Sequence, residues 1–298
     1  MREFKILGVL VFFTALLYIG VEPFAHSQMH KHVEPPEYDF KDADGVDKNI
    51  VGDAKNGAAL VQANCIACHS ITKAGFAPMM DDATSAASYG VVPPDLSTAG
   101  AMYDPHFLAA FIKNPAKATK TEHKYEDGAV HPMPSYNWMK PQEIADMVAY
   151  LKSIAPKTMT NKEVFLDACN RCHSMKYDGM KIITDGPNGV RKEGLKARSD
   201  VSKYMGKTPP DLSQYTRSRS ISYLHEFIND PQKHLPGTAM PRVGLTKKAE
   251  DQVIKYMEEV GEVKKPVREA LGPKFLAYLV IFTIFAFLWK AKIWREVH

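Results

Sequence analysis

Two apolar runs lie near the ends of the chain, and hydrophobic residues recur at helical spacing between them. The first run, Ile6 to Val21, and the second, Phe275 to Trp289, contain no charged residue. Residues 104–113 and 222–229 place apolar side chains at i, i+3 and i+4, which predicts amphipathic helices. Little of the chain alternates between apolar and polar residues as a half-buried strand does. The pattern therefore predicts a mainly α-helical protein.

Four further helices are expected, at residues 56–71, 141–154, 162–174 and 246–260. Pro141 suits the first turn of its helix, and Thr246 suits the N-cap position of the last one. Pro115 and Pro231 are expected to end the helices at 104–113 and 222–229, because proline cannot continue the backbone hydrogen bonding.

The two apolar runs predict membrane helices. A span needs about 20 apolar residues, and lysines flanking these slightly shorter runs can extend them toward the headgroups. For the first run a cleaved signal peptide is the alternative, although no clean small-x-small cleavage site follows it. We expect an N-terminal transmembrane helix in residues 1–25, a linker in 26–51 and a C-terminal transmembrane anchor in 263–298.

Basic residues lie outside both runs, at Arg2 and Lys5 and at Lys290, Lys292 and Arg295. The positive-inside rule then places both termini in the cytoplasm. The centre of the chain is expected on the opposite side, which is the periplasm in a Gram-negative bacterium.

All four cysteines belong to two C-x-x-C-H motifs, at residues 65–69 and 169–173. This pattern is typical of covalent haem attachment. Two thiols three residues apart share one face of a helical turn, so both can form thioethers with one porphyrin, and the histidine then reaches the iron. A redox C-x-x-C pair and a zinc knuckle are the alternatives. The predicted haem-binding residues are Cys65, Cys68, His69, Cys169, Cys172 and His173.

The motifs open an internal repeat. Pro-Pro-Asp-Leu-Ser at 93–97 recurs at 209–213, and the apolar segment ending in Asn114-Pro115 recurs with Asp230-Pro231. The dipeptides Met133-Pro134 and Met240-Pro241 follow in the same order. The repeat predicts two tandem, mostly α haem domains, at residues 52–156 and 157–262.

Met133 and Met240 are the predicted distal ligands of the two irons. Each precedes a proline in a non-helical stretch before the last helix of its repeat. Methionine and histidine are the usual sixth ligands of an electron-transfer haem, and methionine raises the potential. The local alternatives are His131, Met139 and His234.

Pro94 and Pro210 are expected to wall the haem edge on the histidine side. The same Pro-Pro-Asp-Leu-Ser segments equally fit a turn whose Asp or Ser caps a following helix. If each iron has six ligands, neither has an open position for a substrate. This favours one-electron transfer over oxygen or peroxide chemistry.

The formal net charge is only +4, which argues against nucleic-acid binding. Basic residues gather at 113–120 and 191–198. Such stretches are either solvated surface or a docking site for an acidic redox partner.

Each half resembles a class I cytochrome c domain. The second half, with Cys172-His173-Ser174-Met175, Pro-Pro-Asp-Leu-Ser at 209–213 and an anchor after it, resembles the haem-c subunit of the cytochrome bc complex (complex III, quinol–cytochrome c reductase). With two haem domains and an N-terminal apolar run, the chain is most similar to the dihaem cytochrome c subunits of epsilonproteobacterial bc complexes. Similar dihaem subunits occur in actinobacteria.

The resemblance implies two covalently bound haem c groups, with cytochrome b and a Rieske iron–sulfur protein as partner subunits. Electrons would pass from the Rieske protein to a periplasmic cytochrome c or a terminal oxidase, through a subunit without independent catalytic activity. The chain would lie in the bacterial inner membrane with its haem domains in the periplasm. The main alternative is the dihaem cytochrome c subunit of a cbb-type haem–copper oxidase, whose anchor typically precedes the haem domains. A dihaem peroxidase, a dehydrogenase's cytochrome subunit and a membrane-tethered shuttle remain open.

Overall fold

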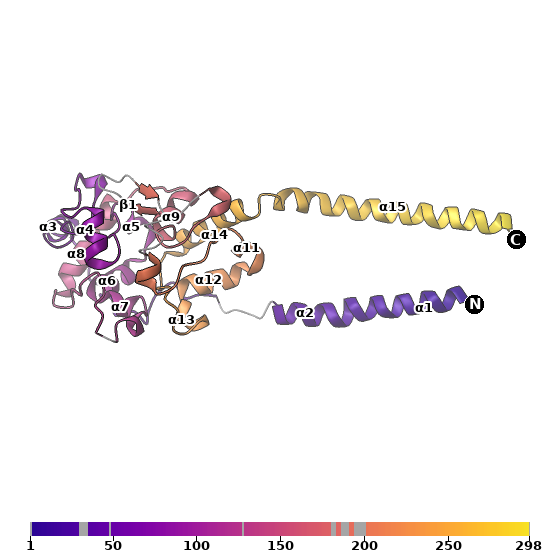
Figure 1. The fold of residues 1–298 in the computed structure, drawn as a ribbon, viewed down its shortest axis with the longest axis horizontal. Coiled ribbons are helices and arrows are strands. Elements are labelled where there is room, and N and C mark those ends of the chain that lie inside the picture. The colour runs from indigo at the N-terminus through magenta and orange to yellow at the C-terminus, as the bar shows by residue number, and fades with distance from the viewer. Residues whose placement is uncertain are drawn as a thin grey trace.

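The computed structural model describes residues 2–29, 35–47, 49–126, 128–179, 183–185, 191–193 and 201–297. A helical body carries two long terminal helices (Figure 1). Helix α1 (Arg2–Ala15), the π-helical segment η1 (Leu16–Val21) and α2 (Glu22–Met29) form the first, and α15 (Lys265–Val297) forms the second. Both reach away from the body in the same direction, so the two termini lie at the same end of the molecule (Figure 1).

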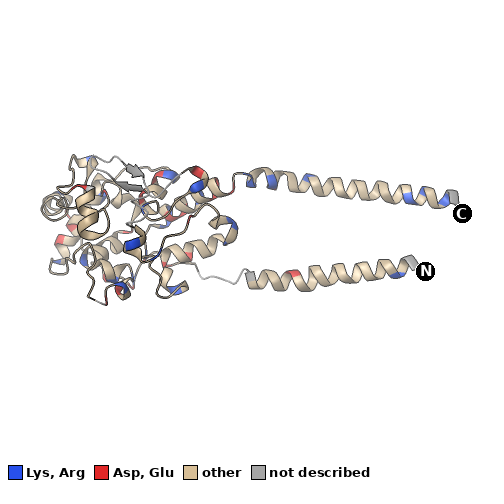
Figure 2. Cartoon of the chain, viewed as in Figure 1, with Lys and Arg blue, Asp and Glu red and all other residues tan. Residues whose placement is uncertain are grey.

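The two terminal helices are long and apolar enough to cross a membrane. Phe4–Gln28 has a mean hydropathy of 2.2 and Lys265–Arg295 one of 2.0, and neither apolar window is buried against the body. Charged residues are sparse along both helices and gather toward their ends (Figure 2). A signal peptide would share the length and composition of the N-terminal helix.

The first half of the body is centred on the pairing of α3 (Ala54–Asn64) with α8 (Pro141–Ile154). Gly57 permits their close approach, because a Cβ there would lie 1.9 Å from the carbonyl oxygen of Asp146. The buried Asp146 carboxylate accepts hydrogen bonds from the backbone N of Asp53 (2.7 Å) and the side chain of Asn56 (2.6 Å). The other elements are η2 (Thr72–Ala74), α4 (Asp82–Tyr89), α5 (Ala99–Met102), α6 (Pro105–Lys113), α7 (Pro115–Ala118) and η3 (Glu122–Lys124).

The second half repeats this plan with α9 (Asn161–Ala168) against α14 (Lys247–Gly261). The predicted cap is confirmed, since the Thr246 hydroxyl accepts from the backbone N of Ala249 (3.2 Å). The remaining elements are η4 (Lys176–Asp178), β1 (Ile183–Asp185), β2 (Arg191–Glu193), α11 (Tyr215–Ser218), α12 (Ile221–Asn229) and α13 (Pro231–His234). The two short strands pair antiparallel, with Ile183 opposite Glu193.

The expected helix boundaries hold in places and fail in others. Helix α8 spans the predicted residues 141–154. Pro115 and Pro231 follow the ends of α6 and α12, but each then begins a short helix of its own, where its missing N–H costs nothing. The two helices predicted to carry the cysteine motifs, at 56–71 and 162–174, are shorter than predicted. They end before the motifs, at Asn64 and Ala168.

The two halves share a core rather than touching only at the surface. The backbone N of Thr246 donates to the carbonyl of Met102 (2.8 Å), and the N of Asp104 donates to the carbonyl of Gly244 (3.0 Å). Met102 of the first half is 2% exposed and packs within the core of the second half. Gly244 has φ +72°, and a Cβ there would lie 1.9 Å from the Phe107 ring, so this crossing requires glycine.

Candidate haem sites

The cysteine motifs lie in hydrogen-bonded turns just past their helices. The Cys65 carbonyl accepts from the backbone N of Cys68 (3.1 Å) and of His69 (2.9 Å), and the Cys169 carbonyl accepts from Cys172 and His173 at the same two distances. These two hydrogen bonds close one turn after each helix, and the helices themselves end at Asn64 and Ala168 instead of continuing as predicted to residues 71 and 174. The two cysteines of each motif therefore lie within one hydrogen-bonded backbone turn.

None of the four cysteines forms a disulfide. Burial, followed by the neighbouring thiol of each motif, raises the pKa of Cys65 and of Cys169 to about 12. A structural zinc site needs four ligands, and among the described residues no group of three or more His, Cys, Asp or Glu side chains that could hold a metal ion is found.

Each motif histidine is oriented by a proline carbonyl. Nδ1 of His69 lies 2.7 Å from the Pro94 oxygen, and Nδ1 of His173 lies 2.8 Å from the Pro210 oxygen. A carbonyl only accepts, so Nδ1 carries the proton and the lone pair of Nε2 is left for a metal. Burial lowers the pKa of both histidines, which keeps the rings neutral. This is the arrangement a haem iron requires of a histidine ligand, so these residues fit the cofactor.

The Asp and Ser of Pro-Pro-Asp-Leu-Ser fix the proline loop to the chain after the histidine. Asp95 accepts from the backbone N of Thr72 (3.0 Å), and the Ser97 hydroxyl accepts from Lys73 N (3.1 Å). In the second half Asp211 accepts from Ser174 Oγ (2.7 Å). The expected capping of a following helix is wrong, since α5 and α11 have no side-chain cap.

Met133 belongs to the same half of the body as the first motif. It is half-buried and packs against the core that also includes Cys65 and Leu96. Met240 is half-buried in the loop after α13, and its backbone N lies 3.3 Å from Thr238 Oγ1. Iron ligation by either sulfur stays a prediction.

The alternative ligands are engaged elsewhere. The ring of His131 packs edge-on against Tyr125, and its Nδ1 lies 3.1 Å from the Met133 backbone N. Met139 is 7% exposed and buried among the apolar side chains of the first core. Nε2 of His234 lies 3.2 Å from the Glu226 carboxylate. These contacts disfavour Met139 and His234, whereas an Nδ1 contact of the kind that His69 also makes does not disfavour His131.

Tertiary structure brings the two motifs to one interface. The side chain of Arg171, inside the second motif, donates to the carbonyl of Val92 next to the first proline pair. The hydroxyls of Tyr125 and Tyr204 meet across the same boundary at 2.7 Å. The positive charge of Arg171 adds to burial in lowering the pKa of His69. Sequence reasoning missed Arg171, because the middle positions of C-x-x-C-H carry no signal.

The first basic stretch is largely neutralised by acids of the linker. Lys113 pairs with Asp44 (3.1 Å), and Lys120 pairs with Asp42 (2.8 Å). These ion pairs weaken the prediction that residues 113–120 dock an acidic partner. The side chains of the second stretch, 191–198, lie outside the described residues.

The matches with known proteins cover different shares of the chain. Residues 54–155 match the family model for cytochrome c. Cytochrome c type-1 of Ascaris suum is 30% identical over 115 residues, which cover 36% of this chain and 90% of that protein. The ammonia monooxygenase gamma subunit of Nitrosomonas europaea is 23% identical over 188 residues, covering 45% of this chain and 80% of that protein.

Among solved structures, a chain of a hyperthermophilic respiratory Complex III aligns with a TM-score of 0.36 and 22% identity. The alignment covers 46% of this chain and 75% of that chain. The family assignment rests on the family model, whose match spans the first site, and on the Ascaris suum relative, 90% of which the chain covers. The chain belongs to the cytochrome c family, and its cofactor is haem c.

Proposed function

We propose that this protein is a membrane-anchored dihaem cytochrome c of a quinol–cytochrome c reductase. It carries electrons from a Rieske iron–sulfur protein to a periplasmic cytochrome c or terminal oxidase. The observation that carries the proposal is a second histidine–proline site, built like the first and followed directly by the apolar helix α15.

The second site supports a second haem because its backbone repeats the first. The turn distances at Cys169 equal those at Cys65, and the two histidine–carbonyl distances differ by only 0.1 Å (2.7 and 2.8 Å). We infer that Cys65, Cys68, His69 and Met133 hold one haem, and that Cys169, Cys172, His173 and Met240 hold the other. Pro94 and Pro210 orient the histidines. When bound, each haem iron supplies one-electron oxidation and reduction.

Two membrane helices support the proposed location. They leave the body in one direction, so both can enter the same bilayer while the body stays on one side (Figure 1). Together with the basic residues outside each span, this favours the bacterial inner membrane with the haem domains in the periplasm. Cytochrome b and the Rieske protein are the proposed partners, consistent with the relative named cytochrome c type-1.

The cbb-type oxidase subunit remains the second candidate, because an apolar helix also precedes the haem domains. The position of α15 after the second site favours the reductase.

Purification through this chain in a mild detergent tests the proposal. We expect haem b by reduced-minus-oxidised spectroscopy and a Rieske signal by electron paramagnetic resonance. Haem b with copper and oxygen consumption, but without a Rieske signal, would move the chain to the oxidase. Haem c alone would leave a tethered shuttle.

A further inference from the structure

The linker after the N-terminal helix is packed between the two halves. Phe40 is 1% exposed, although it lies in a connecting segment and has φ +46°. Its ring centroid lies 5.3 Å from that of Phe107 in the first half. On the other side it lies 4.9 Å from the guanidinium carbon of Arg242 in the second half. Residues 35–47, here called the linker strap, therefore contact both halves at one point.

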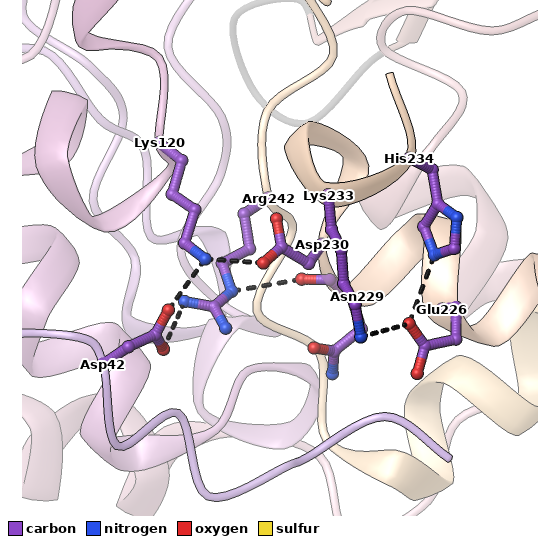
Figure 3. A network of polar contacts seen from close by, with 8 residues as sticks. All are labelled: Asp42, Lys120, Glu226, Asn229, Asp230, Lys233, His234 and Arg242. Carbon is purple, nitrogen blue, oxygen red and sulfur yellow. Dashed lines mark hydrogen bonds and ion pairs between the residues drawn. The ribbon is translucent and has the colours of Figure 1, made fainter. Parts of the chain in front are cut away.

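Arg242 connects this strap to the loop of Met240, two residues earlier in the chain. Its guanidinium donates to the Asp42 carboxylate (2.7 Å) and, through Nε, to the Asn229 carbonyl at the end of α12 (3.1 Å) (Figure 3). Its backbone N donates to the carbonyl of Thr119 in the first half (3.0 Å). Arg242 is only 5% exposed, so it is one of the most buried charges of the described residues.

Lys120 completes the network. Its ammonium group lies 2.8 Å from Asp42 and 2.5 Å from Asp230, so one first-half cation joins the strap to the second half (Figure 3). Burial alone would raise the pKa of Asp42, but hydrogen bonds from Lys120 and Arg242 hold that pKa below its usual range. Asp42 is thus an anion at every pH near neutrality.

The first half holds its methionine loop differently. Ser135 stands two residues after Met133, as Arg242 stands after Met240, and its hydroxyl donates to the Lys113 carbonyl at the end of α6 (2.5 Å). Lys113 and Asn229 are matching positions of the repeat. Each methionine loop is therefore bonded to the C-terminal end of the matching helix in its own half, α6 or α12. The serine contact stays within the first half, whereas the arginine reaches on to the strap.

We propose that Arg242 is a positioning residue through which the linker strap holds the Met240 loop in place for the second haem. The proposal rests on the proposed ligation by Met240. Without the guanidinium, the Asp42 carboxylate and the Asn229 carbonyl each lose a buried partner, and the loop loses its link to Phe40. Methionine ligation at the second haem then depends, through Arg242, on a segment more than 190 residues earlier in the chain, whereas the Ser135 contact of the first loop does not involve that segment.

The test compares Arg242→Gln with the matched control Ser135→Ala in the detergent-purified full chain. The readouts are the near-infrared charge-transfer band of methionine-ligated ferric haem and a redox titration that resolves the two haems. For Arg242→Gln we expect loss of up to about half of the band, the share of one site in two, and a lower potential for one haem only. Ser135→Ala should leave the potential of the second haem unchanged.

Asp42→Asn keeps Arg242 and tests the strap directly, and should shift the same haem in the same direction by less. Covalent haem content by mass shows whether each variant has matured with two haems. If Arg242→Gln does not fold, Asp42→Asn decides the question. An unchanged band and unchanged potentials in the folded variants, or equal shifts of both haems, would overturn the proposal. Because these readouts need no partner subunit, they are independent of whether the chain belongs to a quinol–cytochrome c reductase.

Discussion

The two halves place opposite chemistry on matching helix positions. Three positions that are apolar in the first half are ionisable in the second. They are 109 and 110 of α6, which correspond to 225 and 226 of α12, and 144 of α8, which corresponds to 250 of α14. The first set is Ala109, Ala110 and Ile144, and the second is His225, Glu226 and Glu250. All are buried except His225, which is half-buried. One backbone plan thus accepts either an apolar or a polar interior.

The polar interior survives because each carboxylate has partners. Glu250, which is fully buried, accepts a hydrogen bond from the hydroxyl of Tyr38 (2.7 Å) and lies 2.6 Å from Nδ1 of His225. Glu226 lies 3.4 Å from Lys233 and 3.2 Å from His234 (Figure 3). The linker strap serves both halves, because it offers Tyr38 to the polar face and Phe40 to the apolar one. A buried acid is tolerable only where such partners are supplied.

Removing the two cysteines of one motif should have the largest effect, because one half of the protein then lacks its covalent haem while the other keeps it. Cys169→Ala with Cys172→Ala should leave one covalent haem per chain, because the remaining motif still forms its thioethers. Cys65→Ala with Cys68→Ala is the matched variant. Intact-mass measurement on the denatured protein counts the haems, and two haems in either double variant would rule out that motif as an attachment site.

Removing the aromatic ring shared by both halves should cost most in stability. Phe40→Ala deletes a ring that is 1% exposed, and such changes cost about 3–5 kcal/mol. Trp138, which is 68% exposed, provides the control Trp138→Ala with a much smaller loss. Urea unfolding measures both. A loss for Phe40→Ala no larger than that of the control would mean that the strap does not join the halves in solution.

Replacing the methionines tests whether the two sites are equivalent. Met133→Ala and Met240→Ala should each lower the potential of one haem, since methionine ligation raises it. We expect a fall on the order of 100 mV, a fraction of the roughly 0.8 V over which axial ligands set haem potentials. A redox titration resolves the two waves. An unchanged titration would remove that methionine from the coordination sphere.

The buried Glu250 should make the stability of the second half fall as pH rises. The pKa of Glu250 is raised on folding, chiefly because the carboxyl is buried. Hydrogen bonds from His225 and Tyr38 oppose this rise, and the negative charge of Asp251 adds to it. A carboxyl whose pKa is raised by folding stabilises the fold below its unfolded pKa of about 4.3, and that contribution is lost as pH rises through the folded-state value. Relative to Glu250→Gln, the natural chain should therefore lose stability as pH rises above about 4.3.

The matched control is Ile144→Val, which should cost about 0.5–1.5 kcal/mol at every pH. Denaturant unfolding between pH 4 and pH 8 measures both variants. Parallel curves for Glu250→Gln and the natural chain would show that Glu250 does not titrate in this range.

The amino-acid sequence by itself determined the parts of this protein that depend on neighbouring residues. Hydrophobic period and proline placement located α8, and a threonine before a helical pattern located the cap of α14. The C-x-x-C-H spacing and the apolar terminal runs are likewise local, so they could be read without a fold. Covalent and hydrogen-bonding geometry over a few residues explains each of these successes.

Only the tertiary structure decided how distant residues complete the sites. The carbonyl of Pro94 meets His69, Arg171 reaches Val92, and the linker strap meets Arg242. The sequence pattern also did not predict that the helices end at Asn64 and Ala168. Nor did it predict that Asp95 and Asp211 accept hydrogen bonds from the backbone after each motif histidine. Each of these contacts satisfies a buried polar group with a partner far along the chain, and such partners are chosen by packing rather than by local periodicity.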